Sequence, residues 1–212
     1  MKLHDYWRSG ASYRVRIALN LKGLPYTQIG HDLRTGAQRA ADYIAINPQG
    51  LVPALEFGDG IVTQSMAILE RLEEEYPTPA LLPAYPMDRA IVRSMANIVA
   101  CDVHPINNLR ILTALRRDLG ASEDQLSAWI ARWIGDGFAA IEPMIARDGG
   151  TFAFGDTPTF ADCCLVPQVY SAERFGVPLD RFPRLVAAVE AARILPAVAA
   201  AHPSRQADAD PD

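Results

Sequence analysis

The strongest constraint on the fold is a change of hydrophobic periodicity along the 212-residue chain. Over residues 1–78, short strand-like runs are interleaved with helical stretches whose apolar residues recur every three or four positions. Four prolines then fall within residues 77–86, a composition typical of a stiff linker. No strand pattern returns beyond it, so the sequence predicts an α/β domain followed by an all-helical one.

The elements of the first domain are expected in the order βαβαββα. A strand in "KLHDYW" precedes a helix over residues 12–22, whose apolar stripe leaves Arg16 outward and which Gly23 ends. "PYTQIG" predicts the second strand and "AQRAADYIAIN" a shorter helix. "VPALEF" and "IVTQ" predict a hairpin around a Gly-Asp-Gly turn, and "SMAILERLEEEY" the closing helix, with Ser65 as a candidate cap.

The second domain carries helix signals only. Ser122 or Glu123 stands near the start of one long helix, and Thr159 with Asp162 forms a short capping box ahead of another. A helix break is expected at His104, which precedes a proline. The predicted boundaries are residues 1–78 for the first domain, 79–86 for the linker, 87–204 for the helical domain and 205–212 for a polar tail, which we expect to be disordered.

Composition and missing motifs exclude several function classes. A net charge of −5 offers no footprint for nucleic acid, and no apolar run approaches the roughly 20 residues that span a bilayer. The N-terminus lacks a secretion signal and the three cysteines form no CxxC pair, so we expect a cytoplasmic protein and no disulfide oxidoreductase. The histidines and cysteines lack the spacing of metal ligands, and dinucleotide, phosphate-loop and hydrolase-elbow motifs are absent.

Residues 8–12, Arg-Ser-Gly-Ala-Ser, lie where the first predicted strand meets the first helix. The amides and the positive dipole end of a helix start favour an anion there. A hydroxyl at Ser9 or Ser12 can also donate to a thiolate and thereby lower the pKa of the thiol. Either serine is equally an ordinary N-cap, so the turn alone leaves both interpretations open.

Two further segments of the same domain favour a peptide ligand. "NPQGLVPAL" places Val52 before Pro53 at a strand entrance, where a cis peptide bond would expose the valine backbone to an extended peptide. "TQSMAI" places Gln64 and Ser65 at a helix start that suits a carboxylate. A hydroxyl, a backbone edge and a carboxylate-binding helix end thus follow one another along one domain.

With these motifs, the chain resembles the zeta class of the glutathione transferase family, which includes maleylacetoacetate and maleylpyruvate isomerases. The resemblance covers nearly the whole chain, from "WRSGASYRVRIALNLKG" through "NPQGLVPAL", "TQSMAILERLEEEYPTPALLP" and "CDVHPINNLRIL" to "GDTPTFADCCLVPQVYSAERF". It implies a thioredoxin-like first domain, a helical second domain, glutathione as cofactor and a homodimer.

The resemblance also implies roles for individual residues. Ser9 would stabilise the glutathione thiolate, Val52 beside Pro53 would pair with the cysteinyl backbone, and the γ-glutamyl carboxylate would bind at the predicted helix start. The full set of implied glutathione-binding residues is Ser9, Gln38, Gln49, Val52, Pro53, Gln64, Ser65, Asp102, His104 and Asn108. For His104 a structural position at a helix end stays open.

The implied reaction is cis–trans isomerisation of a small dianionic maleyl compound, with glutathione regenerated. Arg8, Arg110 and Arg174 are the implied cations, since planar guanidinium groups bind carboxylates in two places and stabilise developing negative charge. Arginines at helix ends are also commonly solvated or paired with acids. Arg14 and Arg16 are expected to serve structure.

The sequence departs from the family pattern at position 11, and this departure narrows the range of activities to be expected. Many zeta enzymes carry Ser-Ser-Cys where this chain has Ser9-Gly10-Ala11, so no protein thiol at position 11 can resolve a mixed disulfide. This argues against reductive dehalogenases and leaves isomerisation unaffected. The alternatives are a glutathione transferase acting on haloacids or other electrophiles, and a binding module without chemistry. The choice between maleylacetoacetate and maleylpyruvate stays open.

Overall fold

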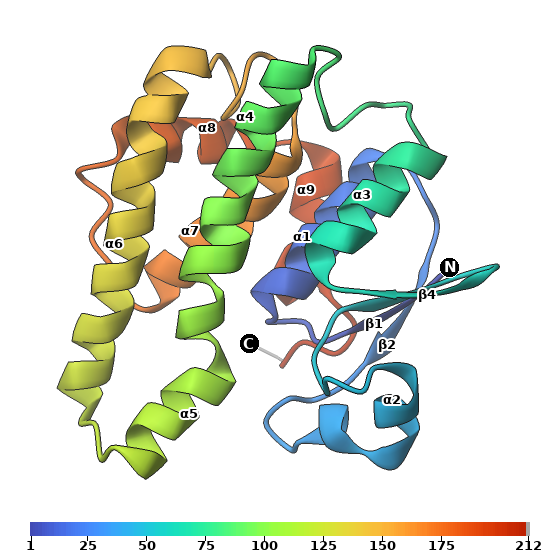
Figure 1. Ribbon diagram of the computed structural model, residues 1–212, viewed down its shortest axis with the longest axis vertical. Coiled ribbons are helices and arrows are strands. Elements are labelled where there is room, and N and C mark those ends of the chain that lie inside the picture. Colours follow the sequence, from blue (N-terminus) through green and yellow to red (C-terminus); the bar gives the residue numbers. More distant parts are fainter. Residues whose placement is uncertain (211–212) are drawn as a thin grey trace. The chain divides into compact units, whose positions relative to one another are not determined.

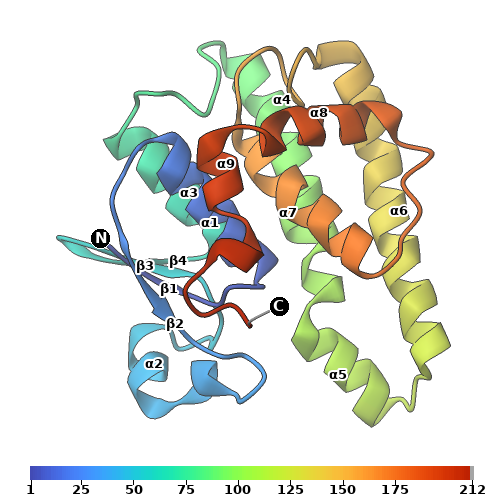
Figure 2. The same ribbon diagram turned by 180° about the vertical axis from the view of Figure 1, so that it is seen from behind.

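The computed structural model describes residues 1–210, which form two compact units. One unit contains residues 1–81 together with 194–210, and the other contains residues 82–193. Figures 1 and 2 show the elements of each unit from opposite sides.

The first unit is built on a four-stranded sheet in the order β2-β1-β3-β4 (Figure 1). Its strands are β1 (Lys2–Asp5), β2 (Thr27–Gly30), β3 (Ala54–Phe57) and β4 (Gly60–Thr63). β1 pairs parallel with β2 and antiparallel with β3, and β3 and β4 form the predicted hairpin. The predicted βαβαββα order and thioredoxin-like architecture are confirmed.

Three helices complete the α/β part of this unit: α1 (Gly10–Leu21), α2 (Ala41–Ile46) and α3 (Ser65–Glu75). α1 begins two residues before the predicted start because Ser9, not Ser12, is its N-cap. The helix predicted over "AQRAADYIAIN" is split into a 3₁₀ turn, η1 (Ala37–Arg39), and α2, because Ala40 between them has an extended backbone.

Arg16 of α1 lies inside the unit, so its predicted outward position was wrong. Its side chain and that of Asp5 are both fully buried, and Arg16 Nη1 donates to both Asp5 carboxylate oxygens at 2.9 and 2.8 Å. A buried charge is tolerated only when it is paired and hydrogen-bonded. The pair therefore ties the end of β1 to the middle of α1.

The second unit is helical, as predicted. It contains α4 (Pro86–Asn97), a π-helix η2 (Ile98–Val103), the 3₁₀ turn η3 (Pro105–Asn107), α5 (Leu109–Asp118), α6 (Glu123–Asp148), α7 (Phe160–Arg174) and α8 (Pro183–Arg193). The expected break falls at His104, between η2 and η3. Both predicted caps are present: Ser122 forms a capping box with Gln125, and Thr159 forms one with Asp162.

The structure divides the chain differently from the predicted boundaries. α4 starts at Pro86, inside the predicted linker, and residues 194–204 belong to the first unit, not to the helical one. The reason is that α9 (Pro196–Ala200) packs on α1, where Asn20 Nδ2 donates to the Ala197 carbonyl at 2.9 Å.

The polar tail also differs from expectation. The 3₁₀ turn η4 (Pro203–Arg205) ends at the first residue of the tail, and further along the Trp7 amide donates to the carboxylate of Asp208 at 3.0 Å. Residues 205–210 are therefore ordered against the first unit, while residues 211 and 212 of the predicted tail lie outside the described residues. No helix in residues 1–210 combines the length and apolarity that crossing a bilayer requires.

Candidate functional site

The turn between β1 and α1 presents Ser9 at the start of a helix. The Ser9 amide donates to the Tyr6 carbonyl at 2.9 Å, and the Ser9 hydroxyl oxygen accepts from the Ser12 amide at 3.3 Å. Capping uses a lone pair of the hydroxyl, so its proton can still be donated to a ligand. The two interpretations of this serine are therefore compatible. The first turn of α1 holds no acidic residue that would offset the positive end of the helix dipole.

The loop that leads into β3 forms a backbone edge near this turn. The Val52–Pro53 peptide is cis, as predicted. Val52 packs with Tyr6, Trp7 and Tyr43 in one buried cluster. Within residues 1–210, neither the amide nor the carbonyl of Val52 forms a hydrogen bond, which leaves both available to an extended peptide.

The position of that edge is set by the residue before it. The Leu51 carbonyl accepts from the Tyr43 hydroxyl and from Asn47 Nδ2, both at 2.6 Å. Burial raises the pKa of Tyr43 to about 12, so the phenol stays protonated and remains a donor at neutral pH.

The start of α3 combines backbone strain with a buried cation. Gln64 has φ 70°, the only positive φ of a non-glycine residue in residues 1–210. Such a conformation costs about 1–3 kcal/mol and marks positions where function maintains it. Next to it, the buried Ser65 hydroxyl accepts from Arg14 Nη1 at 3.2 Å. With no acid in the first turn of α3, this helix start favours a carboxylate ligand.

Arg14, which the sequence analysis expected to serve structure, also lies at this helix start. Its side chain is only 2% exposed and reaches from α1 to the first residue of α3. Because Arg14 stands between two other buried residues of α1, Tyr13 and Val15, its place in the sequence gave no signal that it would reach the start of α3.

The two predicted glutamines lie beside these elements. Gln49 is exposed, and its Oε1 accepts from Gln64 Nε2 at 2.6 Å. Gln38, in η1, has a buried side-chain oxygen without a hydrogen-bond partner among the described residues, and such an acceptor calls for a donor from a ligand or water. Gly50 lets the chain pass closely here, since a Cβ on it would lie 3.2 Å from the Gln38 carbonyl.

In the helical unit, three predicted residues fall within one irregular segment. Asp102 is exposed on η2, His104 follows directly, and the side-chain oxygen of Asn108 caps α5 by accepting from the Arg110 amide at 3.1 Å. π-Helical turns are rare and frequent at functional sites. The segment is held in place by Trp129, whose Nε1 donates to the Ile106 carbonyl at 3.0 Å.

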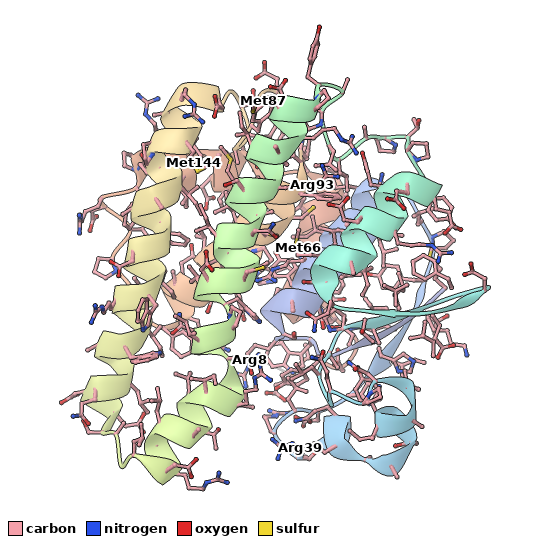
Figure 3. The ribbon with its side chains drawn as sticks, viewed as in Figure 1. Arg8, Arg39, Met66, Met87, Arg93 and Met144 are labelled. Carbon is pink, nitrogen blue, oxygen red and sulfur yellow. The ribbon has the colours of Figure 1, made fainter. Side chains whose placement is uncertain are left out.

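The three predicted substrate arginines are divided between the units. Arg8 belongs to the first unit, just before α1 (Figure 3). Its guanidinium lies 4.8 Å from the Trp7 ring centroid. Arg110 is exposed in the first turn of α5, and Arg174 is exposed at the end of α7 with its guanidinium 4.4 Å from the Phe175 ring centroid. Within residues 1–210, no group of three or more candidate ligands is arranged to hold a metal ion.

Known proteins match the chain over both units. The family description "Glutathione S-transferase, N-terminal domain" matches residues 8–75, and "Glutathione S-transferase, C-terminal domain" matches residues 108–191. The maleylacetoacetate isomerase of Pseudomonas aeruginosa is 49% identical over 211 residues, with 98% of each chain covered. A holo structure of a bacterial maleylpyruvate isomerase of the zeta class is 51% identical, with a TM-score of 0.97 and coverage of 99% of this chain and 100% of that one.

The chain belongs to the zeta class of the glutathione transferase family. The chain is also similar to the maleylacetoacetate isomerase of Methylobacterium extorquens AM1, solved with bound malonate and glutathione. It is 40% identical, with a TM-score of 0.95 and full coverage of both chains. For this glutathione transferase, the first unit offers a hydroxyl donor, a backbone edge and a carboxylate-binding helix start, which together suit a tripeptide with a thiol at its centre.

Proposed function

We propose that the protein is a glutathione-dependent cis–trans isomerase that converts maleylacetoacetate or maleylpyruvate to the fumaryl product. The observation that carries this proposal is Ser9 at the N-cap of α1, with its hydroxyl proton available to a thiolate and no acid in the first turn. Support comes from the two relatives that are named as isomerases of these compounds. The relative that holds glutathione together with malonate, a small dianion, supports the substrate class.

Bound glutathione supplies the thiolate whose reversible addition lets the maleyl double bond rotate. Ser9 donates a hydrogen bond to that sulfur and, with the end of the α1 dipole, lowers the pKa of the thiol. A single hydroxyl donor stabilises the thiolate moderately, so the sulfur keeps its nucleophilicity and also leaves readily.

The remaining groups orient the tripeptide. The amide and carbonyl of Val52, next to Pro53, pair with its cysteinyl backbone. The γ-glutamyl carboxylate binds at the start of α3, where Gln64 and Ser65 lie and the Arg14 guanidinium adds a positive charge. The other residues proposed to bind glutathione are Gln38, Gln49, Asp102, His104 and Asn108.

Arg8, Arg110 and Arg174 bind the substrate. Its carboxylates carry two negative charges at neutral pH, and a third would pass to it from the glutathione sulfur during the reaction. Guanidinium groups suit this task because they stay protonated and bind carboxylate in a bidentate manner. Positive charge at the reacting end stabilises the transition state more than the bound substrate, which is what accelerates the reaction.

We further propose that the enzyme is a homodimer in the cytoplasm. The three cysteines are free thiols, and Cys101 is exposed, which suits a reducing compartment. Light scattering of the purified full chain tests the dimer directly, and a monomer at micromolar concentration would contradict it.

The test follows the loss of maleyl absorbance for each substrate, with and without glutathione. Ser9→Gly is the informative variant, because glycine keeps most of the capping stability while the hydroxyl is lost. We expect kcat/KM to fall about 10- to 100-fold, since a hydrogen bond to a charged group contributes about 1.5–3 kcal/mol. Ser9→Thr should retain the hydroxyl and most of the activity, and Ser12→Ala serves as the matched control. Full rates without glutathione, or an unchanged Ser9→Gly enzyme, would reject the proposal.

A further inference from the structure

The backbone of Tyr6 and Trp7 is held by the side chains of Asp5, Arg16 and Asp208. β1 ends at Asp5, so these two residues lie beyond the strand pairing. The Tyr6 amide donates to Asp5 Oδ1 at 2.6 Å, and the Trp7 carbonyl accepts from Arg16 Nη2 at 2.8 Å. The Trp7 amide donates to Asp208 Oδ2 at 3.0 Å. Every one of these bonds is made just before the turn that carries Ser9.

Asp208 belongs to the same network as the buried ion pair. Gln28 Nε2 bridges Asp5 Oδ2 at 2.7 Å and Asp208 Oδ1 at 3.2 Å. Both carboxylate oxygens of Asp208 are therefore engaged, one by Gln28 and one by the Trp7 amide. The peptide units on the two sides of Trp7 are thus fixed, one through its amide by Asp208 and the other through its carbonyl by Arg16.

The segment that supplies Asp208, residues 196–210, runs along this unit beside β1 and the start of α1 (Figure 2). Arg16 Nε donates to the Ala201 carbonyl at 3.1 Å. Ala209 packs against the buried cluster that contains Trp7 and Val52. The end of β2 approaches closely as well, because a Cβ on Gly30 would lie 3.1 Å from Asp208 Oδ2. The segment is therefore anchored on both sides of Asp208.

We propose that Asp208 is a positioning residue for the reaction, which fixes the Ser9 turn through the Trp7 amide. The proposal rests on the proposed function for its chemistry, and on the contacts of Asp208 for its structure. Ser9 lies two residues after Trp7, and its own amide is bonded back to Tyr6. Hydrogen bonds weaken steeply when distance and angle depart from their optimum, so a small shift of this turn weakens the bond from the Ser9 hydroxyl to the thiolate.

The test compares full-length wild type with Asp208→Ala and Asp208→Asn. Asp210→Ala is the matched control, because Asp210 lies in the same segment but, within residues 1–210, pairs only with the exposed Arg34, at 2.7 Å. Four quantities are measured: amide hydrogen exchange at Trp7 and Ser9, the pKa of the enzyme-bound glutathione thiol from thiolate absorbance, and kcat and KM for the maleyl substrate at saturating glutathione.

We expect Asp208→Ala to accelerate exchange at Trp7, to raise the pKa of the bound thiol and to lower kcat about tenfold, the effect of weakening one hydrogen bond to a charged group. Asp208→Asn keeps an acceptor for Trp7 and should restore kcat to within about twofold of wild type, as should Asp210→Ala. The proposal would be overturned if Asp208→Ala had a lower melting temperature but the same thiol pKa and kcat as the wild type. Asp208 would then be a structural residue only.

A second variant covers the case in which Asp208→Ala fails to fold. Gly30→Ala keeps the Asp208 carboxylate but shifts its position, because the added Cβ would lie 3.1 Å from Asp208 Oδ2. It should therefore move the thiol pKa and kcat in the same direction as Asp208→Ala, by a smaller factor. Wild-type values in Gly30→Ala, together with faster exchange at Trp7, would count against the proposal. A wild-type enzyme that does not ionise glutathione would contradict the proposed function instead, and exchange at Trp7 and Ser9 would then decide by itself whether Asp208 fixes the turn.

Discussion

The buried carboxyl of Asp162 makes the stability of the helical unit depend on pH. Asp162 Oδ1 accepts from the Ala153 amide at 2.9 Å, and Oδ2 accepts from the Thr159 amide at 2.8 Å and from the Thr159 hydroxyl at 3.1 Å. Burial raises the pKa of Asp162 from 3.8 to about 6, against these hydrogen bonds, which lower it. The substitution that tests this is Asp162→Asn, which has nearly the same shape and does not titrate.

The direction in which stability changes with pH follows from whether the folded or the unfolded state binds the proton more tightly. Because the pKa of the folded state is the higher one, the native protein binds one more proton than the unfolded chain between about pH 4 and pH 6. The stabilisation is present in full below about pH 4 and is lost as the pH rises through 6. One pKa unit corresponds to about 1.4 kcal/mol, so between pH 4.5 and 7.5 the wild type should lose about 2 kcal/mol of unfolding free energy relative to Asp162→Asn.

Urea unfolding of both proteins at pH 4.5, 6.0 and 7.5 measures that difference, and the other titrating groups cancel in the subtraction. Asp162→Ala is the companion variant. It leaves the Ala153 and Thr159 amides without an acceptor and should destabilise the protein by about 2–6 kcal/mol. At pH 7.5 the destabilisation should be smaller, because the variant no longer buries the charged carboxylate. A wild type that gains stability relative to Asp162→Asn as the pH rises would refute the reasoning, because the three donors would then outweigh burial.

Three other outcomes are expected. Gln64→Gly should be about 1 kcal/mol more stable in urea unfolding than Gln64→Ala, since only glycine adopts the positive φ without strain. Calorimetry should show that both variants bind glutathione more weakly than the wild type. Equal stabilities of the two variants would mean that the backbone at Gln64 stores no strain. Gly137→Ala should lower the free energy of unfolding by about 1–3 kcal/mol, because its Cβ would overlap the Val103 side chain of η2, and thermal denaturation checks this. Arg110→Ala and Arg174→Ala should raise KM for the maleyl substrate more than KM for glutathione, and the opposite pattern in steady-state kinetics would exclude them as substrate ligands.

Local chemistry made much of the fold predictable. The cap at Ser122, the capping box of Thr159 with Asp162 and the break at His104 all depend on neighbours a few residues away, and the sequence shows those neighbours directly. The same holds for the order of strands and helices in the first unit. The split of the second helix at Ala40 was missed because an extended alanine has no compositional signal.

Features that depend on distant residues were not predictable. The helical periodicity of α1 placed Arg16 outward, and only the fold shows that Asp5 receives it inside. The polar composition of residues 205–210 indicated disorder, because nothing in those residues reveals that the amide of Trp7, about 200 positions earlier, needs an acceptor. The positive φ of Gln64 is equally hidden, since glutamine is not a residue that favours it.

The membership of residues 194–210 in the first unit has a consequence for how the protein is made. During synthesis the whole helical unit leaves the ribosome before the acceptor carbonyl of Ala201 becomes available to Arg16. Until then the buried guanidinium lacks one of its partners, so the first unit reaches its final form after the helical unit has been translated. An excised fragment ending at residue 81 would keep that defect permanently.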